Sequence, residues 1–599
     1  MLKNPKYNDK QLEAINHGNG PLLILAGAGS GKTSTLVGRI IHLLEQGTPP
    51  ESILAITFTN KAAREIRERV KKVLHNKDPE IARNIFLGTF HSFGALLLRK
   101  LAPHARRTPS FTIYDSSDSE GLVKKILKEL NLPENPSRKP AKVLGEFSRI
   151  KSRREESTDE LINNLFKTYE ERLERNNAFD FDDLIVKPIE ILEREENLAA
   201  RYHSLYDYIL IDEFQDTNTA QYSLIRLLAG KGNVNVVGDD AQSIYGWRHA
   251  DYRIFLNFES DWPGTKIVKL EENYRSTGTI LKAANHLIGF NKFQKEKTLF
   301  TKNPEGKEIK VVIADGPESE ADYIVGEIRN MVRDGESMQE IALLYRTNAQ
   351  SRALEQALLG EGIPYQIFGG LKFYERMEIK DILAGLRLIA NPTDSASFDR
   401  LEKNLGKRIT KKVVGRLKEK SGADSPAPLI NFFLEVSDYV QSLKTEKNAL
   451  DRLENIQELI KYAEGKSDLV SFLEEVSLVQ SVDDPSGSRL PGVNLLTIHL
   501  AKGLEFNRVF VVGCVDGILP HERSLSSHID IEEERRLMYV AITRARHELV
   551  ITIYGIPSRF LNELPQEVLS LQSLAPRRRF SDSRSFDDLE EDAWLSYDN

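Results

Sequence analysis

A glycine-rich turn close to the start of the sequence has the residue types of a phosphate-binding loop. Residues 21–36 read PLLILAGAGSGKTSTL, so that an apolar run leads into three glycines followed by a lysine and a threonine. Glycines allow successive backbone N–H groups to converge on phosphate oxygens, and the helix expected from about Gly31 adds its positive dipole end. Lys32 would reach the β- and γ-phosphates of a nucleotide, and the Thr33 hydroxyl would hold Mg²⁺. The predicted loop comprises Ala26, Gly27, Ala28, Gly29, Ser30, Gly31, Lys32, Thr33 and Ser34.

Two later stretches supply the carboxylates that nucleotide hydrolysis needs. In YDYILIDEFQDT an apolar run ends in the adjacent acids Asp212 and Glu213, and in NVNVVGDDAQSIYGWR a second run ends shortly before Gln242. Open parallel sheets bind ligands at the carboxyl ends of their strands, where these side chains would lie. Asp212 could hold Mg²⁺, Glu213 could orient and deprotonate water, and the Gln242 amide could contact both the γ-phosphate and that water. Kinase-like and GTPase-like switches would use the same parts, so these residues predict ATPase-type chemistry without naming its task.

The bulk composition limits the class of protein. The 599 residues are 40% hydrophobic and 29% charged, and they include a single cysteine, Cys514. The length suggests about four domains, and no apolar run approaches the roughly 20 residues of a membrane span. One cysteine excludes an internal disulfide, and the N-terminal residues lack the apolar core of a signal peptide. We therefore expect a cytoplasmic protein without a membrane partner.

The net charge of −7 does not identify a partner. Residues 60–72 and 402–420 are strongly basic, whereas the tail sequence FDDLEEDAW is acidic. A basic surface can coexist with acidic surfaces elsewhere in a chain of several domains. Taken alone, each basic run is explained more simply by a solvated helix face.

Alternating strand and helix patterns indicate an α/β fold with two parallel sheets. PLLILA, ILAITF, YDYILID, NVNVVGD and KIVKLEE form a first group of strand-like runs, and IKVVIAD, IALLYR, VNLLTIH, RVFVVG and ELVITIY a second. A polar, mainly helical stretch interrupts each group, which predicts two α/β domains with one helical insertion each. The predicted division is 1–88 with 203–273 for the first α/β domain, 89–202 for its insertion, 274–390 with 487–570 for the second α/β domain, 391–486 for its insertion, and 571–599 for a disordered tail.

The stretches predicted to bind and hydrolyse a nucleotide belong to a longer series of motifs. AGAGSGKT, AITFTNKAAREI, GTFHSF, LIDEFQDTNTAQY, VVGDDAQSIYGWRHAD, LEENYRS, LLTIHLAKGLEF and EEERRLMYVAITRAR occur in this order. Together they resemble the UvrD/Rep/PcrA family of superfamily-one DNA helicases, over about residues 4–565 with interruptions. The resemblance implies two RecA-like motor domains that use ATP and Mg²⁺ to move 3′ to 5′ along single-stranded DNA and to unwind duplex. It implies single-stranded DNA and its junctions with duplex as partners, and it is compatible with repair or replication proteins as further partners.

The same resemblance assigns further residues to the nucleotide. Gln11 resembles the glutamine that reads adenine, because its amide can serve both a donor and an acceptor. Tyr274 resembles the aromatic residue that stacks on the base, and Glu505 the carboxylate that holds the ribose. Arg275 and Arg544 resemble the two arginines that reach the γ-phosphate from the second motor domain, a role that suits a permanently charged, forked guanidinium. Hydrolysis in a cleft between two domains would then become relative domain motion.

A second set of residues resembles the family's DNA track. Phe58, Tyr245 and Trp247 resemble aromatics that stack with bases, an interaction of roughly 1–3 kcal/mol per base that tolerates any sequence. His499 resembles a residue that couples the DNA and ATP sites. The predicted contacts with the DNA backbone are Asn60, Lys61, His91 and Arg248.

Several positions depart from the family pattern. Ser34 stands where close relatives carry an arginine that covers the second face of adenine, which puts base affinity or selectivity in question. His249 replaces a usual glycine, and Leu500 a usual small polar residue. The second insertion is shorter than the family norm, and its KRITKK lacks the Gly-Ile-Gly signature that relatives use to hold duplex DNA. We therefore expect weaker duplex engagement and less autoinhibition by this insertion.

Parts of this pattern raise three alternatives to a DNA helicase. An ATP-driven translocase that strips bound proteins with little unwinding is compatible with the short insertion. A helicase–nuclease subunit would need a carboxylate and lysine cluster after the motor, and the sequence ends before one. An RNA track stays open, because stacking aromatics do not read the 2′-hydroxyl.

Overall fold

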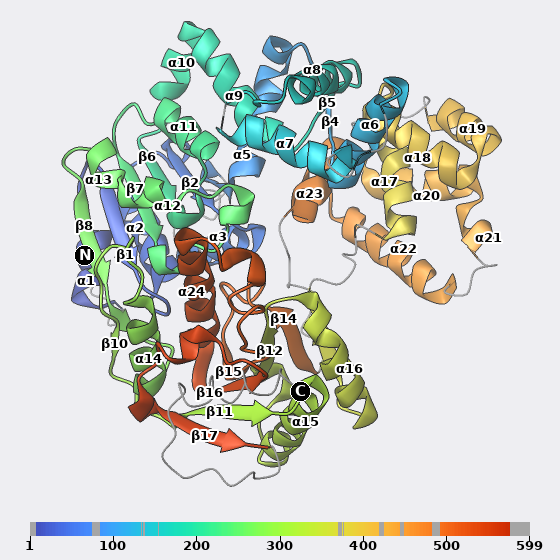
Figure 1. The fold of residues 1–599 in the computed structure, drawn as a ribbon. Helices are drawn as coiled ribbons and strands as arrows, with labels where there is room; N and C mark the ends of the chain where they lie inside the picture. The colour runs from blue at the N-terminus through green and yellow to red at the C-terminus, as the bar shows by residue number, and fades with distance from the viewer. Residues whose placement is uncertain are drawn as a thin grey trace.

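Two parallel sheets with flanking helices form the centre of the molecule, and two mainly helical lobes lie beside them (Figure 1). The computed structural model describes residues 7–74, 84–132, 135, 138–153, 155–368, 374, 376–417, 425–443, 449–481 and 492–574. The α/β class with helical insertions, predicted from the strand pattern, is confirmed. Within these ranges, no helix combines the length and the apolar character that crossing a membrane requires.

The first sheet has six parallel strands in the order β3-β2-β6-β7-β1-β8. Its strands are β1 (Leu22–Ala26), β2 (Ile53–Thr57), β3 (Phe86–Thr89), β6 (Tyr208–Ile211), β7 (Val234–Gly238) and β8 (Lys266–Leu270). β1, β2 and β7 are buried throughout, which is why their sequences are continuously apolar instead of alternating. The associated helices are α1 (Asp9–Ile15), α2 (Lys32–Glu45), α3 (Asn60–Leu74), α11 (Thr219–Leu228), α12 (Tyr252–Leu256) and α13 (Phe258–Asp261).

The second sheet has seven parallel strands in the order β13-β14-β12-β15-β16-β11-β17. These are β11 (Ile309–Ala314), β12 (Ile341–Tyr345), β13 (Tyr365–Ile367), β14 (Val493–Thr497), β15 (Phe506–Val511), β16 (Ala545–Tyr554) and β17 (Leu569–Ser573). Its helices are α14 (Gly278–Ile288), α15 (Pro317–Arg333), α16 (Ser351–Gly360) and α24 (His528–Ile542). A small sheet of β9 (Glu272–Asn273) and β10 (Phe300–Thr301) connects the two halves.

The first insertion covers one end of the first sheet. It contains α5 (Phe90–Leu101), α6 (Ser116–Glu129), α7 (Pro140–Arg153), α8 (Glu160–Arg175), α9 (Asp183–Arg194), α10 (Glu196–His203) and the short pair β4 (Thr112–Ile113) and β5 (Ala178–Phe179). α5 and α9 pack into the core of the first sheet, whereas α6 to α8 enclose a separate core around Phe147 and Tyr169. The insertion therefore folds as an extension of the first α/β domain.

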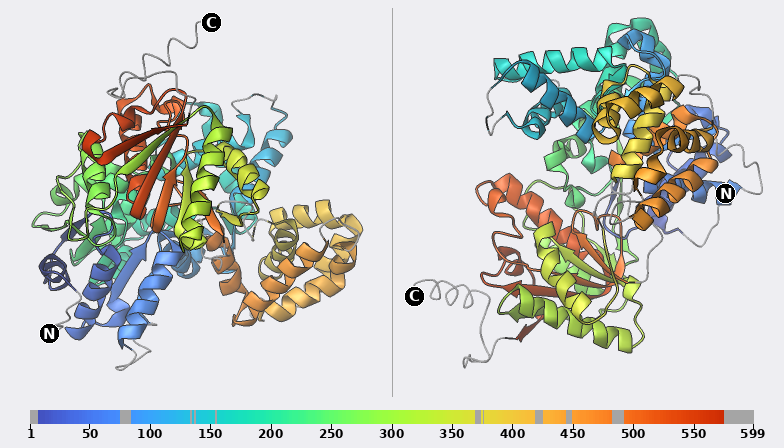
Figure 2. Two further views of the ribbon diagram at one scale, coloured as in Figure 1. Left: turned by 90° about the horizontal axis from the view of Figure 1, so that it is seen from below. Right: turned by 90° about the vertical axis from the view of Figure 1, so that its right-hand side faces the viewer.

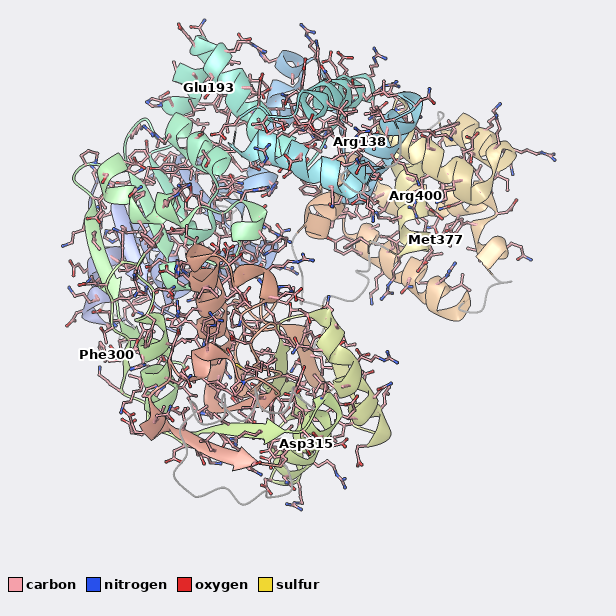
Figure 3. All side chains as sticks on the ribbon, viewed as in Figure 1. Arg138, Glu193, Phe300, Asp315, Met377 and Arg400 are labelled. Atoms are coloured by element: carbon pink, nitrogen blue, oxygen red, sulfur yellow. The ribbon has the colours of Figure 1, made fainter. Side chains whose placement is uncertain are left out.

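The second insertion forms a separate lobe that lies against the helices of the first insertion (Figure 2). Its helices are α17 (Met377–Ala390), α18 (Ser395–Leu405), α19 (Lys407–Leu417), α20 (Pro426–Ser437), α21 (Tyr439–Leu443), α22 (Ala449–Glu464) and α23 (Leu469–Ser481). α17 was predicted to belong to the second α/β domain, which was expected to extend to residue 390, but its apolar face packs in the core of this lobe. Phe433 and Phe472 lie in a core of their own. Arg400 of α18 donates to the Asp381 carboxylate at 2.8 Å and to the Met377 carbonyl at 3.3 Å, which fixes α18 on α17 (Figure 3).

The two insertions contact each other through buried polar groups. The Asn391 amide donates to Thr112 Oγ1 at 2.8 Å and to the Asn176 carbonyl at 2.9 Å. The Tyr114 hydroxyl donates to Asp394 Oδ1 at 2.9 Å. The turn between α17 and α18 is thus anchored on the first insertion.

The end of the second sheet corrects one predicted boundary. Residues 571–573 were expected in the disordered tail, but they belong to β17, which pairs with β11. Leu571 is exposed on this edge strand, so the segment lacks the apolar signal of a buried strand. Residues 575–599 lie outside the described residues, and β3 extends one residue past the predicted boundary at 88.

Candidate nucleotide cleft and nucleic-acid track

The residues predicted to bind nucleotide meet at one edge of the first sheet. β1 leads into the phosphate loop, β6 into Asp212, and β7 into Asp239. The facing wall comes from the second half of the motor, where Glu505 precedes β15 and Arg544 precedes β16. A cleft of about 1100 Å³, a size that accommodates a nucleotide, is lined by the phosphate loop, Glu213 and Gln242 on one side and by Glu505 and Arg544 on the other. The carboxyl edge of one sheet and the amino edge of the other thus form a single site.

The phosphate loop has the backbone that its glycines predict. Gly29 has φ +67° and Gly31, which precedes α2, has φ +84°, both in the left-handed region that favours glycine. Lys32 Nζ is buried and lies 3.4 Å from Glu213 Oε1, and within the described structure it has no hydrogen-bond partner. A buried ammonium without a hydrogen-bond partner, beside the N-terminus of a helix, fits phosphate oxygens as ligands.

The buried Asp212 and the partly buried Glu213 form an acidic pair next to Lys32. Burial and the charge of Glu213 raise the pKa of Asp212. Burial also raises the pKa of Glu213, but Lys32 and Lys502 outweigh that effect and hold it below its usual range. Glu213 has φ +52°, and Gln215 Nε2 donates to its Oε2 at 2.5 Å. Glu213 is therefore ionised and oriented by its neighbours, as a residue that positions water must be.

Arg544 connects the two halves of the motor inside the cleft. Its side chain is buried and donates to the carbonyl oxygens of Val540 and Leu504, both at 3.0 Å. Its Nη2 lies 3.5 Å from Gln242 Oε1, and the Gln242 amide donates to Asp239 Oδ2 at 2.6 Å. Burial lowers the pKa of Arg544 to about 9, so the guanidinium is still charged at neutral pH. An arginine of the second half thus meets the predicted phosphate sensor of the first.

Arg275 and Glu505 lie in the same cleft and bind each other. Arg275 Nε donates to Glu505 Oε2 at 2.6 Å, and its Nη1 donates to the Thr543 carbonyl at 3.1 Å. Arg546 also contacts the Glu505 carboxylate. Burial raises the pKa of Glu505, but the two arginines outweigh it and bring the value to about 2. The predicted contacts of Arg275 with γ-phosphate and of Glu505 with ribose stay predictions.

Gln11 and Tyr274 both bond to Asn8, and Tyr274 lines the cleft. Gln11 Nε2 donates to the Ser30 carbonyl at 3.0 Å, and its Oε1 accepts from the Asn8 N–H at 3.0 Å. The Tyr274 ring is half exposed, and its hydroxyl accepts from Asn8 Nδ2 at 2.7 Å. Tyr274 can therefore offer a ring face, whereas the Gln11 amide already bonds within the protein.

A guanidinium group lies beside Ser34 in the cleft, although Ser34 itself replaces the arginine of close relatives. Arg69 of α3 donates from Nη1 to Ser34 Oγ at 3.0 Å, and both residues line the nucleotide cleft. Lys61 lines this cleft as well. The predicted contacts of Asn60 and Lys61 with the DNA backbone stay predictions, and both residues lie at the start of α3.

The predicted track aromatics form one group. The rings of Phe58 and Tyr245 are stacked, with centroids 5.1 Å apart and an interplanar angle of 21°. Trp247 follows with its centroid 6.4 Å from that of Tyr245 and 61% of its surface exposed. The Arg248 guanidinium lies 4.6 Å from the Trp247 centroid. Cavities of about 850 and 1150 Å³ flank this group, which leaves room for an extended polymer.

The two predicted histidines lie at the walls of these cavities. His91 packs against Phe181 with centroids 5.6 Å apart, and burial lowers its pKa to about 4. His499 faces Trp247 with centroids 6.4 Å apart, and burial together with nearby cations lowers its pKa to about 3. Both rings are neutral at physiological pH. His249 has φ +65°, a backbone that explains why glycine is usual at this position.

Lys502 is a site residue that the sequence analysis missed. Its ammonium donates to Asp216 Oδ2 at 2.5 Å and to the Gln242 carbonyl at 2.6 Å, and it lies 4.9 Å from the Tyr245 ring centroid. It thereby links the second half of the motor to both the sensor and the track of the first. Its motif, HLAKGLEF, gave the only signal, because no local pattern reveals a partner 286 positions away.

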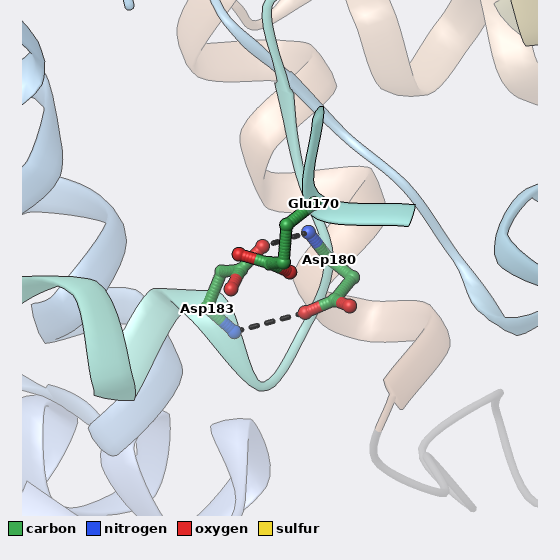
Figure 4. Close-up of side chains that lie close together, drawn as sticks. All are labelled: Glu170, Asp180 and Asp183. Atoms are coloured by element: carbon green, nitrogen blue, oxygen red, sulfur yellow. Dashed lines mark hydrogen bonds between the residues drawn. The ribbon is translucent and has the colours of Figure 1, made fainter. Parts of the chain in front are cut away.

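A cluster of carboxylates in the first insertion has the composition of a metal site but already holds a cation. Glu170, Asp180 and Asp183 lie close together (Figure 4). Lys151 Nζ lies 2.8 Å from Glu170 and 2.7 Å from each aspartate, and its side chain is 2% exposed. Lys187 Nζ also lies 2.8 Å from Glu170, so two ammonium groups offset the charge of the cluster, which identifies it as a structural ion network connecting α7, α8 and α9.

Comparison with known proteins places this architecture in a family. A sequence profile of the UvrD/REP helicase N-terminal domain matches residues 7–263, and one of the UvrD-like helicase C-terminal domain matches 268–425 and 429–555. An ATP-dependent DNA helicase PcrA of Staphylococcus aureus (strain Mu50) is 39% identical, over 95% of this chain and 88% of its own. PcrA of Staphylococcus epidermidis (strain ATCC 12228) is 39% identical, over 97% and 89%. A solved C-terminal domain of a possible DNA helicase from Lactobacillus plantarum covers 50% of this chain and 98% of its own, with a TM-score of 0.24 and 16% identity.

The fold and the cleft define a motor of two α/β domains with a shared nucleotide site. The matched profiles together cover most of the chain. The chain belongs to the UvrD/REP family of superfamily-one helicases.

Proposed function

We propose that this chain is an ATP-dependent DNA helicase that moves 3′ to 5′ along single-stranded DNA and unwinds duplex in repair or replication. The observation that carries the proposal is the meeting of Arg544 with Gln242, 3.5 Å apart, in the cleft next to Lys32. Three residues beyond Gln242, the same loop reaches Tyr245 and then Trp247. Binding or loss of the γ-phosphate at Gln242 would therefore shift the aromatic residues that would stack with bases.

The chain's own residues would divide the work of hydrolysis. The phosphate loop and Lys32 bind the triphosphate, and Glu213 orients the attacking water. Thr33 and Asp212 offer oxygen ligands of the kind that Mg²⁺ prefers, and bound Mg²⁺ would neutralise phosphate charge. Arg544 and Arg275 reach across from the second half, so the cleft closes around the triphosphate and reopens once the γ-phosphate has left.

We further propose that the second insertion has a minor part in unwinding. The basic α19 lacks the Gly-Ile-Gly signature, so its hold on duplex phosphates rests on exposed lysines and arginines alone. Deletion of residues 395–485 should change unwinding and ATPase rates by no more than a few fold. A large rise in unwinding or its complete loss would contradict this minor role.

Unwinding of tailed duplexes tests the main proposal. Wild-type protein should unwind a duplex with a 3′ single-stranded tail in the presence of ATP, and Lys32→Ala should abolish unwinding. Preference for a 5′ tail would overturn the polarity. Single strands of DNA and RNA should be compared as activators of the ATPase, and stronger activation by RNA would assign a different track.

A further inference from the structure

We propose that Glu533 is the positioning residue that couples movement of the second motor domain to the DNA-gripping loop, residues 242–248. This inference rests on the proposed helicase function. Glu533 lies on α24, and its Oε1 accepts a hydrogen bond of 3.0 Å from the backbone N–H of Gly246. Gly246 stands between Tyr245 and Trp247, so the contact lies at the point from which both aromatic side chains project.

Gly246 makes room for this carboxylate. A Cβ built on Gly246 would lie 2.3 Å from Glu533 Oε2 and 3.1 Å from its Oε1. The φ of Gly246 does not fall in the left-handed region, so space and not backbone conformation requires glycine here. The loop and the helix are therefore fitted to each other at this point.

The location of Glu533 is electrostatically unfavourable for a protein that binds a polyanion. Its carboxylate lines the cavity beside Trp247 and Arg248, where a phosphate backbone would be repelled by it. Asp530 and Glu534 add negative charge nearby, and Arg536 is the cation that offsets it. The carboxylate is nevertheless partly buried and bonded to the backbone of the opposite domain. This indicates that the hydrogen bond transmits movement of the second domain to the loop.

α24 connects this contact to the predicted phosphate sensor. Arg544, which lies 3.5 Å from Gln242 Oε1, comes two residues after the end of α24, the helix that carries Glu533. One continuous segment thus contacts the loop twice, through Glu533 within α24 at the aromatics and through Arg544 just past its end at the phosphate sensor. Rotation of the second domain would move both contacts together.

Two substitutions of Glu533 separate geometry from charge. Glu533→Ala removes the acceptor, whereas Glu533→Gln keeps an acceptor oxygen and removes the charge. We expect the alanine variant to lose at least tenfold in DNA-stimulated kcat with the KM for ATP changed less than twofold, and the glutamine variant to stay within threefold of wild type. Asp530→Asn, which removes a charge from the same cavity, serves as the matched control. Tighter DNA binding and faster turnover in both Glu533 variants would show that only charge matters and would overturn the proposal.

Gly246→Ala tests the same contact from the other side. Its methyl group would displace the flexible carboxylate, so this variant should reproduce Glu533→Ala, and the double variant should be no worse than either single one. If the losses of the two single variants multiplied in the double variant, Gly246 and Glu533 would not act through the same contact. Trp247 emission gives a readout that does not depend on turnover: a non-hydrolysable ATP analogue should change it in wild type but not in Glu533→Ala, with Trp247→Phe as the blank. Absence of DNA stimulation in the wild type would instead refute the proposed function itself.

Discussion

Truncation of Trp247 should weaken binding to single-stranded DNA without changing its salt dependence. The ring is 61% exposed, and the Arg248 guanidinium lies 4.6 Å from its centroid, so most of its surface is accessible to a base. Stacking contributes roughly 1–3 kcal/mol per base, and Trp247→Ala removes one such platform. The dissociation constant should therefore rise about 5- to 150-fold at 25 °C.

Arg248→Met provides the contrast, because it removes a charge and leaves the ring in place. On single strands each neutralised phosphate contributes about 0.7 to the slope of log K against log salt. Between 50 and 200 mM salt, the ratio of variant to wild-type affinity should thus change about 2.6-fold for Arg248→Met and stay constant for Trp247→Ala. Anisotropy of a labelled oligothymidine over this range measures both quantities. A salt-dependent ratio for Trp247→Ala, or a dissociation constant within twofold of wild type, would refute the assignment of Trp247 to the bases.

Three further outcomes follow from buried charges. Lys151→Met should lower the free energy of unfolding by about 3–5 kcal/mol, because Asp180 and Asp183 lose the ammonium that pairs with them while Lys187 still pairs with Glu170; thermal unfolding with and without millimolar Ca²⁺ measures this, and a Ca²⁺-stabilised wild type would contradict the structural assignment. Glu213→Gln should lower kcat for ATP about 10²–10⁴-fold while binding of a fluorescent ATP analogue persists, and an equal loss of binding would place the residue in the binding step. Burial lowers the pKa of His499 to about 3, below its value in the unfolded chain, so the ring is uncharged at pH 6 and adds no charge to DNA binding. Because the unfolded chain binds this proton first, the stability that the neutral ring contributes is lost as pH falls from about 6.5 towards 3. His499→Asn should therefore leave the change in DNA affinity between pH 7.5 and 6 unaltered and flatten the loss of stability below pH 6.5.

The strands that position the site could be predicted because burial on both faces leaves a local signal. All ten apolar runs correspond to strands, and the phosphate loop follows β1 as expected. β3, β13 and β17 were missed for a physical reason. FLGT, YQI and LSLQS are short, contain polar residues or glycine, and become strands only through pairing with neighbours that lie far away in the sequence.

The candidate site divides in the same way. Lys32, Asp212 and Gln242 could be placed because each follows a recognisable strand. Lys502 and Glu533 could not, because their partners are 286 and 287 positions away in the other half of the motor. Periodicity reports which face of an element is buried, and it carries no information on which residue of another domain that face will meet.

The contacts between the halves explain why the cleft and the track can act as one device. Residues of the second half contact the loop of residues 242–248 at a side-chain oxygen, a backbone carbonyl and a backbone N–H. Arg544 approaches the side-chain oxygen of Gln242, Lys502 binds its carbonyl, and Glu533 binds the N–H of Gly246. Because side chain and backbone are both fixed, the loop cannot follow one domain without straining against the other. Any change in the angle between the two sheets must therefore alter the spacing between the phosphate sensor and the aromatics, which is the physical requirement for turning hydrolysis into movement along a strand.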